Sequence, residues 1–148
     1  MRSAKLLQVL KQKPTRLPAH KDVAKHSRQW KGKIIVDTTN TFHVTPEDLG
    51  GVLSSEIVSR AFPGAHLVKG FNHLPAAQLG TNRSPNGQRQ AVFLSSNDAD
   101  ASATIASLAT QLGFAPVELG RLDEGGVPLH VVGGQAGGLL FQNLEKPG

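Results

Sequence analysis

The apolar run Ile34-Ile35-Val36 constrains the fold of this chain more than any other feature. Gly32 lies before the run and the residues after it are polar, so the pattern predicts a strand from Lys33 to Asp37. The apolar residues are consecutive and do not alternate with polar ones, which is typical of a strand buried on both faces. Other elements are therefore expected on each side of this strand.

Helices and strands alternate along the following part of the chain. The patterns predict a helix from Ser54 or Ser55 to Phe62, a strand from Ala65 to Phe71, a strand from Gln90 to Ser95, a helix from Asn97 or Asp98 to Leu112, and a strand from Phe114 to Leu119. A serine is expected to cap the first helix, and Asn97 or Asp98 the second. The buried face of the second helix is expected to comprise Ala101, Ile105, Leu108 and Leu112. This order predicts an α/β domain with a mostly parallel sheet and flanking helices.

Basic residues are concentrated at the start of the chain. Residues 1–33 carry ten Lys or Arg against one acid, a net charge of +9, whereas residues 34–148 carry six against ten, a net charge of −4. We therefore expect a basic, helical N-terminal arm, residues 1–30, and an α/β domain, residues 31–148. The arm is interpreted as a solvated segment. Contact with nucleic acid or an anionic membrane, and a role as an organellar transit peptide, are the alternatives.

Composition argues against several classes of function. The sequence contains no Cys, which excludes a disulfide framework, a thiolate metal site and a cysteine nucleophile. It contains no run of roughly 18 to 20 apolar residues that would span a membrane, and the expected compartment is the cytoplasm. Its six His do not follow metal-ligand spacing, so no metal site is predicted. No nucleic-acid motif accompanies the basic charge, which argues against nucleic acid as a partner.

Polar residues lie at the ends of the first two predicted strands. Thr38, Thr39 and Asn40 follow the first strand, and Phe71 and Asn72 lie at the end of the second. The carboxyl ends of parallel strands meet at one edge of an open α/β sheet, where ligands bind. These hydroxyl and amide groups are suited to orient a planar polar ligand. The alternative is that they only satisfy the backbone of two turns.

Six segments in order carry a resemblance to a known family: Gly32–Asn40, Thr45–Gly51, Ser54–Val58, Val68–Asn72, Val92–Asp98 and Leu112–Gly120. They resemble the NADP-binding domain of the deazaflavin-dependent NADP reductases and the cytosolic oxidoreductase domain of the six-transmembrane metalloreductases. Gly70 stands where the Lys-Ala-Phe-Asn sequence of the latter has alanine. The resemblance implies a Rossmann-like fold, NADP as the cofactor, and hydride transfer to a flavin-like or other acceptor. The residues that it places at the cofactor are Thr38, Thr39, Asn40, Phe71 and Asn72.

Three titratable residues near these turns extend this hypothesis. His43 and His73 each lie close behind a turn and are candidate proton donors during hydride transfer. Lys69 lies within the second buried strand, where an unpaired amine is costly. It is expected either to contact an acidic group of the ligand or to reach solvent at an edge.

The sequence also departs from the family. Family members begin with a strand, a G-x-G-x-x-G/A turn and a helix, and this sequence contains no G-x-G-x-x-G. We therefore expect a truncated Rossmann-like domain without the half that binds the pyrophosphate. The chain alone is then expected to bind NADP(H) only at about millimolar concentration, with little or no turnover.

Absence of that half would leave the strand at 33–37 at or near a sheet edge, where unpaired backbone invites association. We expect a homodimer or a partner chain that supplies strands, unless residues 1–30 cover the edge. The alternative to a reductase is a non-catalytic protein. In that case the fold serves oligomerisation or partner binding, and the basic arm supplies the contact surface.

Overall fold

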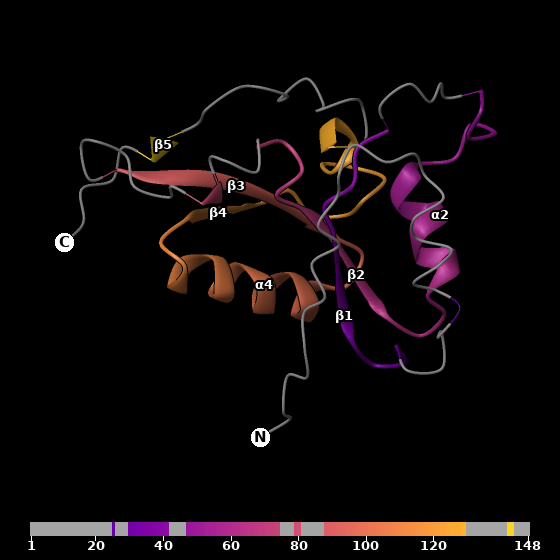
Figure 1. Ribbon diagram of the computed structural model, residues 1–148, viewed down its shortest axis with the longest axis horizontal. Helices are drawn as coiled ribbons and strands as arrows, with labels where there is room; N and C mark the ends of the chain where they lie inside the picture. Colours follow the sequence, from indigo (N-terminus) through magenta and orange to yellow (C-terminus); the bar gives the residue numbers. More distant parts are fainter. Residues whose placement is uncertain are drawn as a thin grey trace.

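The computed structural model describes residues 25, 30–41, 47–74, 79–80, 88–129 and 142–143. The predicted basic arm, residues 1–30, lies outside the described residues except at Lys25 and Trp30. The elements in order are β1 Ile34–Asp37, α2 Ser54–Ala61, β2 His66–Gly70, β3 Arg89–Ser96, α4 Ala99–Gln111, β4 Ala115–Glu118, the 3₁₀ helix η2 Val127–Leu129 and β5 Gln142–Asn143 (Figure 1). Each strand and long helix that the sequence predicted is present.

The sheet joins two parallel pairs of strands. β1 pairs with β2 and β3 pairs with β4, and the order across the sheet is β1-β2-β3-β4. α2 connects the first pair and α4 the second, because parallel strands need a crossover. β2 and β3 are antiparallel, with Lys69 opposite Ser95, and β5 adds a short antiparallel pairing to β3. The predicted α/β fold with a mostly parallel sheet is confirmed, and the antiparallel junction is a feature that side-chain periodicity does not encode.

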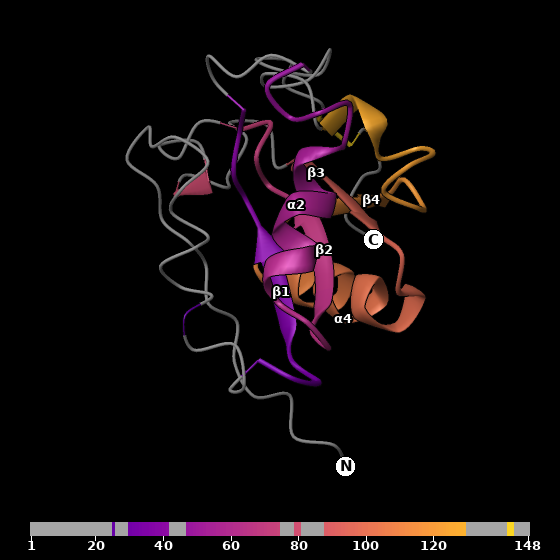
Figure 2. The same ribbon diagram turned by 90° about the vertical axis from the view of Figure 1, so that its right-hand side faces the viewer.

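The two faces of the sheet have separate apolar cores. Ile35 and Leu67 face α2, where they pack with Phe62 at the end of that helix. Val36 and Val68, the next residues in the same strands, face α4. Figure 2 shows the two helices on opposite sides of the strands. β1 and β2 are therefore covered on both faces, as the first apolar run predicted.

α4 packs on the sheet with smaller side chains than its spacing predicted. Its buried residues are Ala101, Ser102, Ile105, Ala106 and Ala109. Leu108 is only half-buried, and Leu112 is the C-cap residue and 50% exposed. The prediction for these two leucines was wrong, because the helix turns its alanines to the sheet and ends before Leu112.

The two helices begin differently. Asp98 is the N-cap of α4, as predicted, and its Oδ1 accepts a hydrogen bond from Ala101 N at 2.9 Å. The N-cap of α2 is Leu53, and no side chain caps this helix. The predicted serine cap is therefore wrong. Ser54 and Ser55 are the first residues of the helix itself, and both are buried.

β1 forms one end of the sheet within the part of the chain that the structure describes. This is the edge position expected for the first strand, and the homodimer or strand-supplying partner stays a prediction. Among the described helices, none has the length and apolar character needed to cross a bilayer.

Candidate functional site

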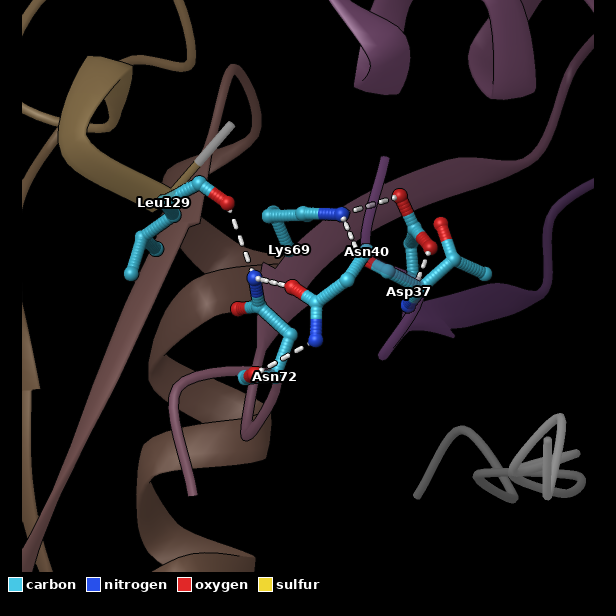
Figure 3. Close-up of polar contacts among 6 residues, drawn as sticks. Asp37, Asn40, Lys69, Asn72 and Leu129 are labelled. Carbon is cyan, nitrogen blue, oxygen red and sulfur yellow. Dashed lines mark hydrogen bonds and ion pairs between the residues drawn. The ribbon is translucent and has the colours of Figure 1, made fainter. Parts of the chain in front are cut away.

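The candidate site lies where β1 and β2 end. These strands are parallel, so Asn40 after β1 lies beside Asn72 after β2. A third segment joins them, because Leu129 at the end of η2 bonds to Asn72 (Figure 3). The fold thus brings together three segments that are far apart in the sequence, and two of the predicted site residues meet directly.

Asn40 and Asn72 bind each other in a defined orientation. Asn40 Nδ2 donates to the backbone oxygen of Asn72 at 2.9 Å, and Asn72 Nδ2 donates to Asn40 Oδ1 at 2.9 Å. Asn72 Nδ2 also donates to the backbone oxygen of Leu129 at 2.8 Å. Backbone oxygens can only accept, so each amide must turn its nitrogen toward one of them. The backbone oxygens of Asn72 and Leu129 therefore determine which way the side-chain amides of Asn40 and Asn72 are turned.

This orientation leaves Asn72 Oδ1 without a donor. Asn72 is 5% exposed, and its Oδ1 has no hydrogen-bond partner among the described residues. A buried acceptor without a partner costs about 1–3 kcal/mol. The atom is fixed in place by the bonds of its own amide nitrogen, so it forms a pre-oriented acceptor for an N–H or O–H group.

Close to these amides, Asp37 and Lys69 form a buried ion pair. Lys69 Nζ lies 3.0 Å from Asp37 Oδ2, and the Lys69 and Asp37 side chains are 1% and 0% exposed. The same ammonium donates to the backbone oxygen of Thr39 at 2.5 Å, while Asp37 Oδ1 accepts from Thr39 N at 2.9 Å. The structure differs from both predictions for Lys69. Its amine does not reach solvent, and its acidic partner is Asp37 rather than a group of the ligand.

The sequence did not single out Asp37 as the partner of Lys69. A signal was available, because each residue is a charged side chain in a buried strand. The register then places them directly opposite each other. Leu129 was missed for a different reason. It contributes only a backbone oxygen, which no residue type reveals.

Phe71 and Thr38 contribute less directly than their positions suggested. Phe71 has a φ of +60°, a left-handed conformation that is uncommon for a residue with a side chain. Its ring packs against Phe114 with centroids 6.1 Å apart, within the core beneath α4. The ring therefore holds the turn after β2, and only its backbone lies beside Asn72. Thr38 is half-buried between Asp37 and Thr39.

His73 is buried beside the site, whereas His43 lies outside the described residues. The His73 ring packs on Phe93 with centroids 4.8 Å apart, and its Nε2 lies 3.4 Å from the backbone oxygen of Ala91. That oxygen only accepts, so Nε2 carries the proton, and Nδ1 is an acceptor without a partner among the described residues. Burial lowers the pKa of His73. The ring is thus uncharged near neutral pH, which argues against the proton-donor hypothesis.

Comparison with known proteins identifies relatives, although no protein-family model matches the chain. Metalloreductase STEAP2 from Mus musculus is 37% identical over 95 residues, and that from Homo sapiens is 35% identical over 95 residues. Each alignment covers 62% of this chain and 18% of the relative. The predicted resemblance is confirmed.

Solved structures of similar proteins extend the match to the fold. A hypothetical protein, SMa0349 from Sinorhizobium meliloti, is 38% identical with a TM-score of 0.76, covering 86% of this chain and 63% of that one. A candidate F420-dependent NADP reductase from Arthrobacter sp. FB24 is 27% identical with a TM-score of 0.59, covering 74% and 53%. The chain is thus an α/β domain similar to part of a metalloreductase and part of an NADP reductase, and it spans less than two thirds of each relative.

The described residues offer a polar site of amides and backbone groups. Within the ranges that the structure covers, no three His, Asp or Glu side chains are placed to hold a metal ion. The groups present at this edge are amides and backbone oxygens that form hydrogen bonds.

Proposed function

We propose that this chain is an NADP(H)-dependent oxidoreductase domain that holds the nicotinamide end of the cofactor at the ends of β1 and β2. The names of the metalloreductase and NADP reductase relatives support this class of function. Hydride would pass between NADP(H) and a flavin-like or other small acceptor, and the role of the protein is to orient the reacting groups.

The observation that carries the proposal is the unpartnered Asn72 Oδ1. A nicotinamide ring bears a primary carboxamide, whose N–H groups match a buried acceptor that lacks a donor. Asn40 keeps the Asn72 amide in this orientation. Thr38 and Thr39 lie next to Asn40, and the backbone of Phe71 lies next to Asn72. We therefore assign five residues to the cofactor: Thr38, Thr39, Asn40, Phe71 and Asn72.

Affinity is expected to be low for the chain alone. A micromolar dinucleotide complex corresponds to about 8 kcal/mol, and a site without a glycine-rich pyrophosphate turn would retain about half of this. That value corresponds to a dissociation constant of roughly millimolar. The contribution of this domain to binding is then concentrated on the nicotinamide half.

NMR titration of the ¹⁵N-labelled chain with three ligands tests the proposal. NADPH and reduced nicotinamide mononucleotide should both shift the side-chain amide signals of Asn40 and Asn72, with similar dissociation constants of about 1 mM. Adenosine 2′,5′-bisphosphate, which lacks the nicotinamide, should leave them unchanged.

Two outcomes would contradict the proposal. A response to the adenosine ligand alone would place the binding elsewhere. No response to any ligand at about 10 mM would favour the non-catalytic alternative.

A further inference from the structure

The ion pair Asp37–Lys69 is explained neither by ligand contact nor by stability. The charged atoms of both side chains already bind each other and the backbone of Thr39, so neither group awaits a ligand partner. A buried pair is also a poor source of stability, because desolvation of the two charges offsets most of their attraction. Apolar side chains of similar volume often serve the fold equally well. Its remaining hydrogen bonds point to a different role.

Both partners bind the backbone of one residue, Thr39. Asp37 Oδ1 accepts the Thr39 N–H at 2.9 Å, and Lys69 Nζ donates to the Thr39 oxygen at 2.5 Å. The peptide groups on both sides of Thr39 are therefore held. The second of them links Thr39 to Asn40 and is planar, so fixing its oxygen fixes the direction in which the chain enters Asn40.

The segment after β1 contains no residue type that restricts the backbone by itself. Residues 38–40 are Thr-Thr-Asn, without the Gly or Pro that usually defines a tight turn. The hydrogen bonds from Asp37 and Lys69 to Thr39 restrict the backbone there. Figure 3 shows the ammonium of Lys69 between Asp37 and the pair of asparagines.

We propose that Asp37 and Lys69 are positioning residues that set the orientation of Asn72 Oδ1 through Thr39 and Asn40. Asn40 transmits the constraint, because its amide binds both the side chain and the backbone of Asn72. The inference rests on the proposed function, in which Asn72 Oδ1 receives the nicotinamide carboxamide. It adds two buried residues that touch no ligand and yet control the geometry of binding.

Removal of both charges together tests this role. The Asp37→Leu/Lys69→Met variant leaves no unpaired buried charge, so its urea midpoint should stay close to wild type. Amide hydrogen exchange at Thr39 should become at least about tenfold faster while exchange in α4 is unchanged. The side-chain signals of Asn40 and Asn72 should move, and NADPH should no longer shift them.

The opposite pattern would overturn the proposal. Exchange at Thr39 and an NADPH response that both match wild type would show that the turn needs no ion pair. Faster exchange throughout the sheet together with a lower urea midpoint would show a merely structural role. If wild type itself does not respond to NADPH, the proposed function fails, while Thr39 exchange and the two asparagine signals still test the positioning role.

A second variant separates the contact of Asp37 with Thr39 from that of Lys69 with Thr39, and it can be used if the first variant does not fold. Asp37→Asn/Lys69→Met keeps an acceptor for the Thr39 N–H and, of the two contacts with Thr39, removes only the hydrogen bond from Lys69 to the Thr39 oxygen. Thr39 exchange should then stay near wild type, whereas the Asn40 and Asn72 signals should still move and lose their NADPH response. Wild-type asparagine signals with a wild-type NADPH response would overturn the role of Lys69.

Discussion

The two faces of the sheet differ sharply at neighbouring residues of the same strands. Val36, Val68 and Leu94 pack beneath α4 in a hydrophobic cluster. The residues after the first two of these, Asp37 and Lys69, lie on the other face and form a buried ion pair. Figure 1 shows α4 beneath the strands and η2 on the opposite side. One face is therefore built by burial of apolar area, and the other, at its carboxyl end, by polar groups that each hold a backbone atom.

This difference separates stability from positioning. Apolar burial contributes stability without regard to direction, whereas a hydrogen bond in the interior holds one geometry and leaves a penalty if its partner is lost. Among the residues that the structure describes, the buried side-chain acceptors without a partner are Asn72 Oδ1 and His73 Nδ1, and both lie in the turn after β2. Stability and binding should thus respond to different substitutions.

The largest effect on stability is expected from Lys69→Met alone. This variant leaves the Asp37 carboxylate buried without its cation, which should lower the free energy of unfolding by about 3–5 kcal/mol. Urea denaturation measures the loss. Asp37→Leu/Lys69→Met is the control and should recover most of it. A single variant as stable as the double variant would contradict a charged, buried pair.

The apolar face should respond in stability alone. Ile105→Ala empties part of the cluster beneath α4 and should cost about 2–5 kcal/mol. Leu112→Ala is the matched control, because this leucine is 50% exposed and its loss should cost less than about 0.5 kcal/mol. NADPH-induced shifts at Asn72 should survive in both variants. A folded Ile105→Ala protein that no longer shows the NADPH-induced shifts at Asn72 would contradict the separation of stability and binding between the two faces.

Gly126→Ala should disturb both stability and the site. An added Cβ would lie 2.0 Å from Ser95 Oγ and 3.0 Å from the Arg121 backbone oxygen, so η2 must move. Overpacking of this kind costs about 1–3 kcal/mol. Movement of η2 displaces the Leu129 oxygen from Asn72, and the Asn72 side-chain signals should shift.

Gly51→Ala is the control for this glycine substitution. Gly51 has a φ of +72° and no atom near the added Cβ, so alanine there should cost about 1–2 kcal/mol through backbone strain. The Asn72 signals should stay in place. Equal shifts in both glycine variants would show that they report general loss of stability.

The smallest effect concerns the cap of α4. The Ala101 N–H, and to a smaller extent His66, hold the pKa of Asp98 below its usual value of 3.8. The contribution of the carboxylate to stability is therefore present above pH 3.8 and is lost as the pH falls through the lower folded pKa.

Asp98→Asn tests this pH dependence. The variant keeps an acceptor for Ala101 N and should cost about 1 kcal/mol or less at neutral pH. Urea denaturation at several pH values should show that the free energies of unfolding of the variant and wild type approach each other below about pH 4. A difference that is constant down to about pH 2 would contradict the assignment.

The sequence predicted the elements of this fold better than their partners. The run Ile34-Ile35-Val36 and the cap at Asp98 carry local signals, and both are confirmed. Asn40 and Asn72 were also found, because residues that follow parallel strands meet at one edge. The Asp37–Lys69 pair and the Leu129 oxygen were not found. Charged side chains in two buried strands were a signal for the pair, but its register and the path of the chain after β4 are not contained in residue type or periodicity.

The most direct test compares Asn72→Ala with Asn97→Ala. Both remove an asparagine that bonds to the backbone, since Asn97 Oδ1 accepts from Leu122 N, but only Asn72 belongs to the site. In ¹⁵N NMR titrations with NADPH, the Asn97→Ala protein should keep the shifts at Thr39 and Asn40, and the folded Asn72→Ala protein should lose them. An Asn72→Ala protein that responds to NADPH as wild type does would contradict the assignment of this edge to the nicotinamide.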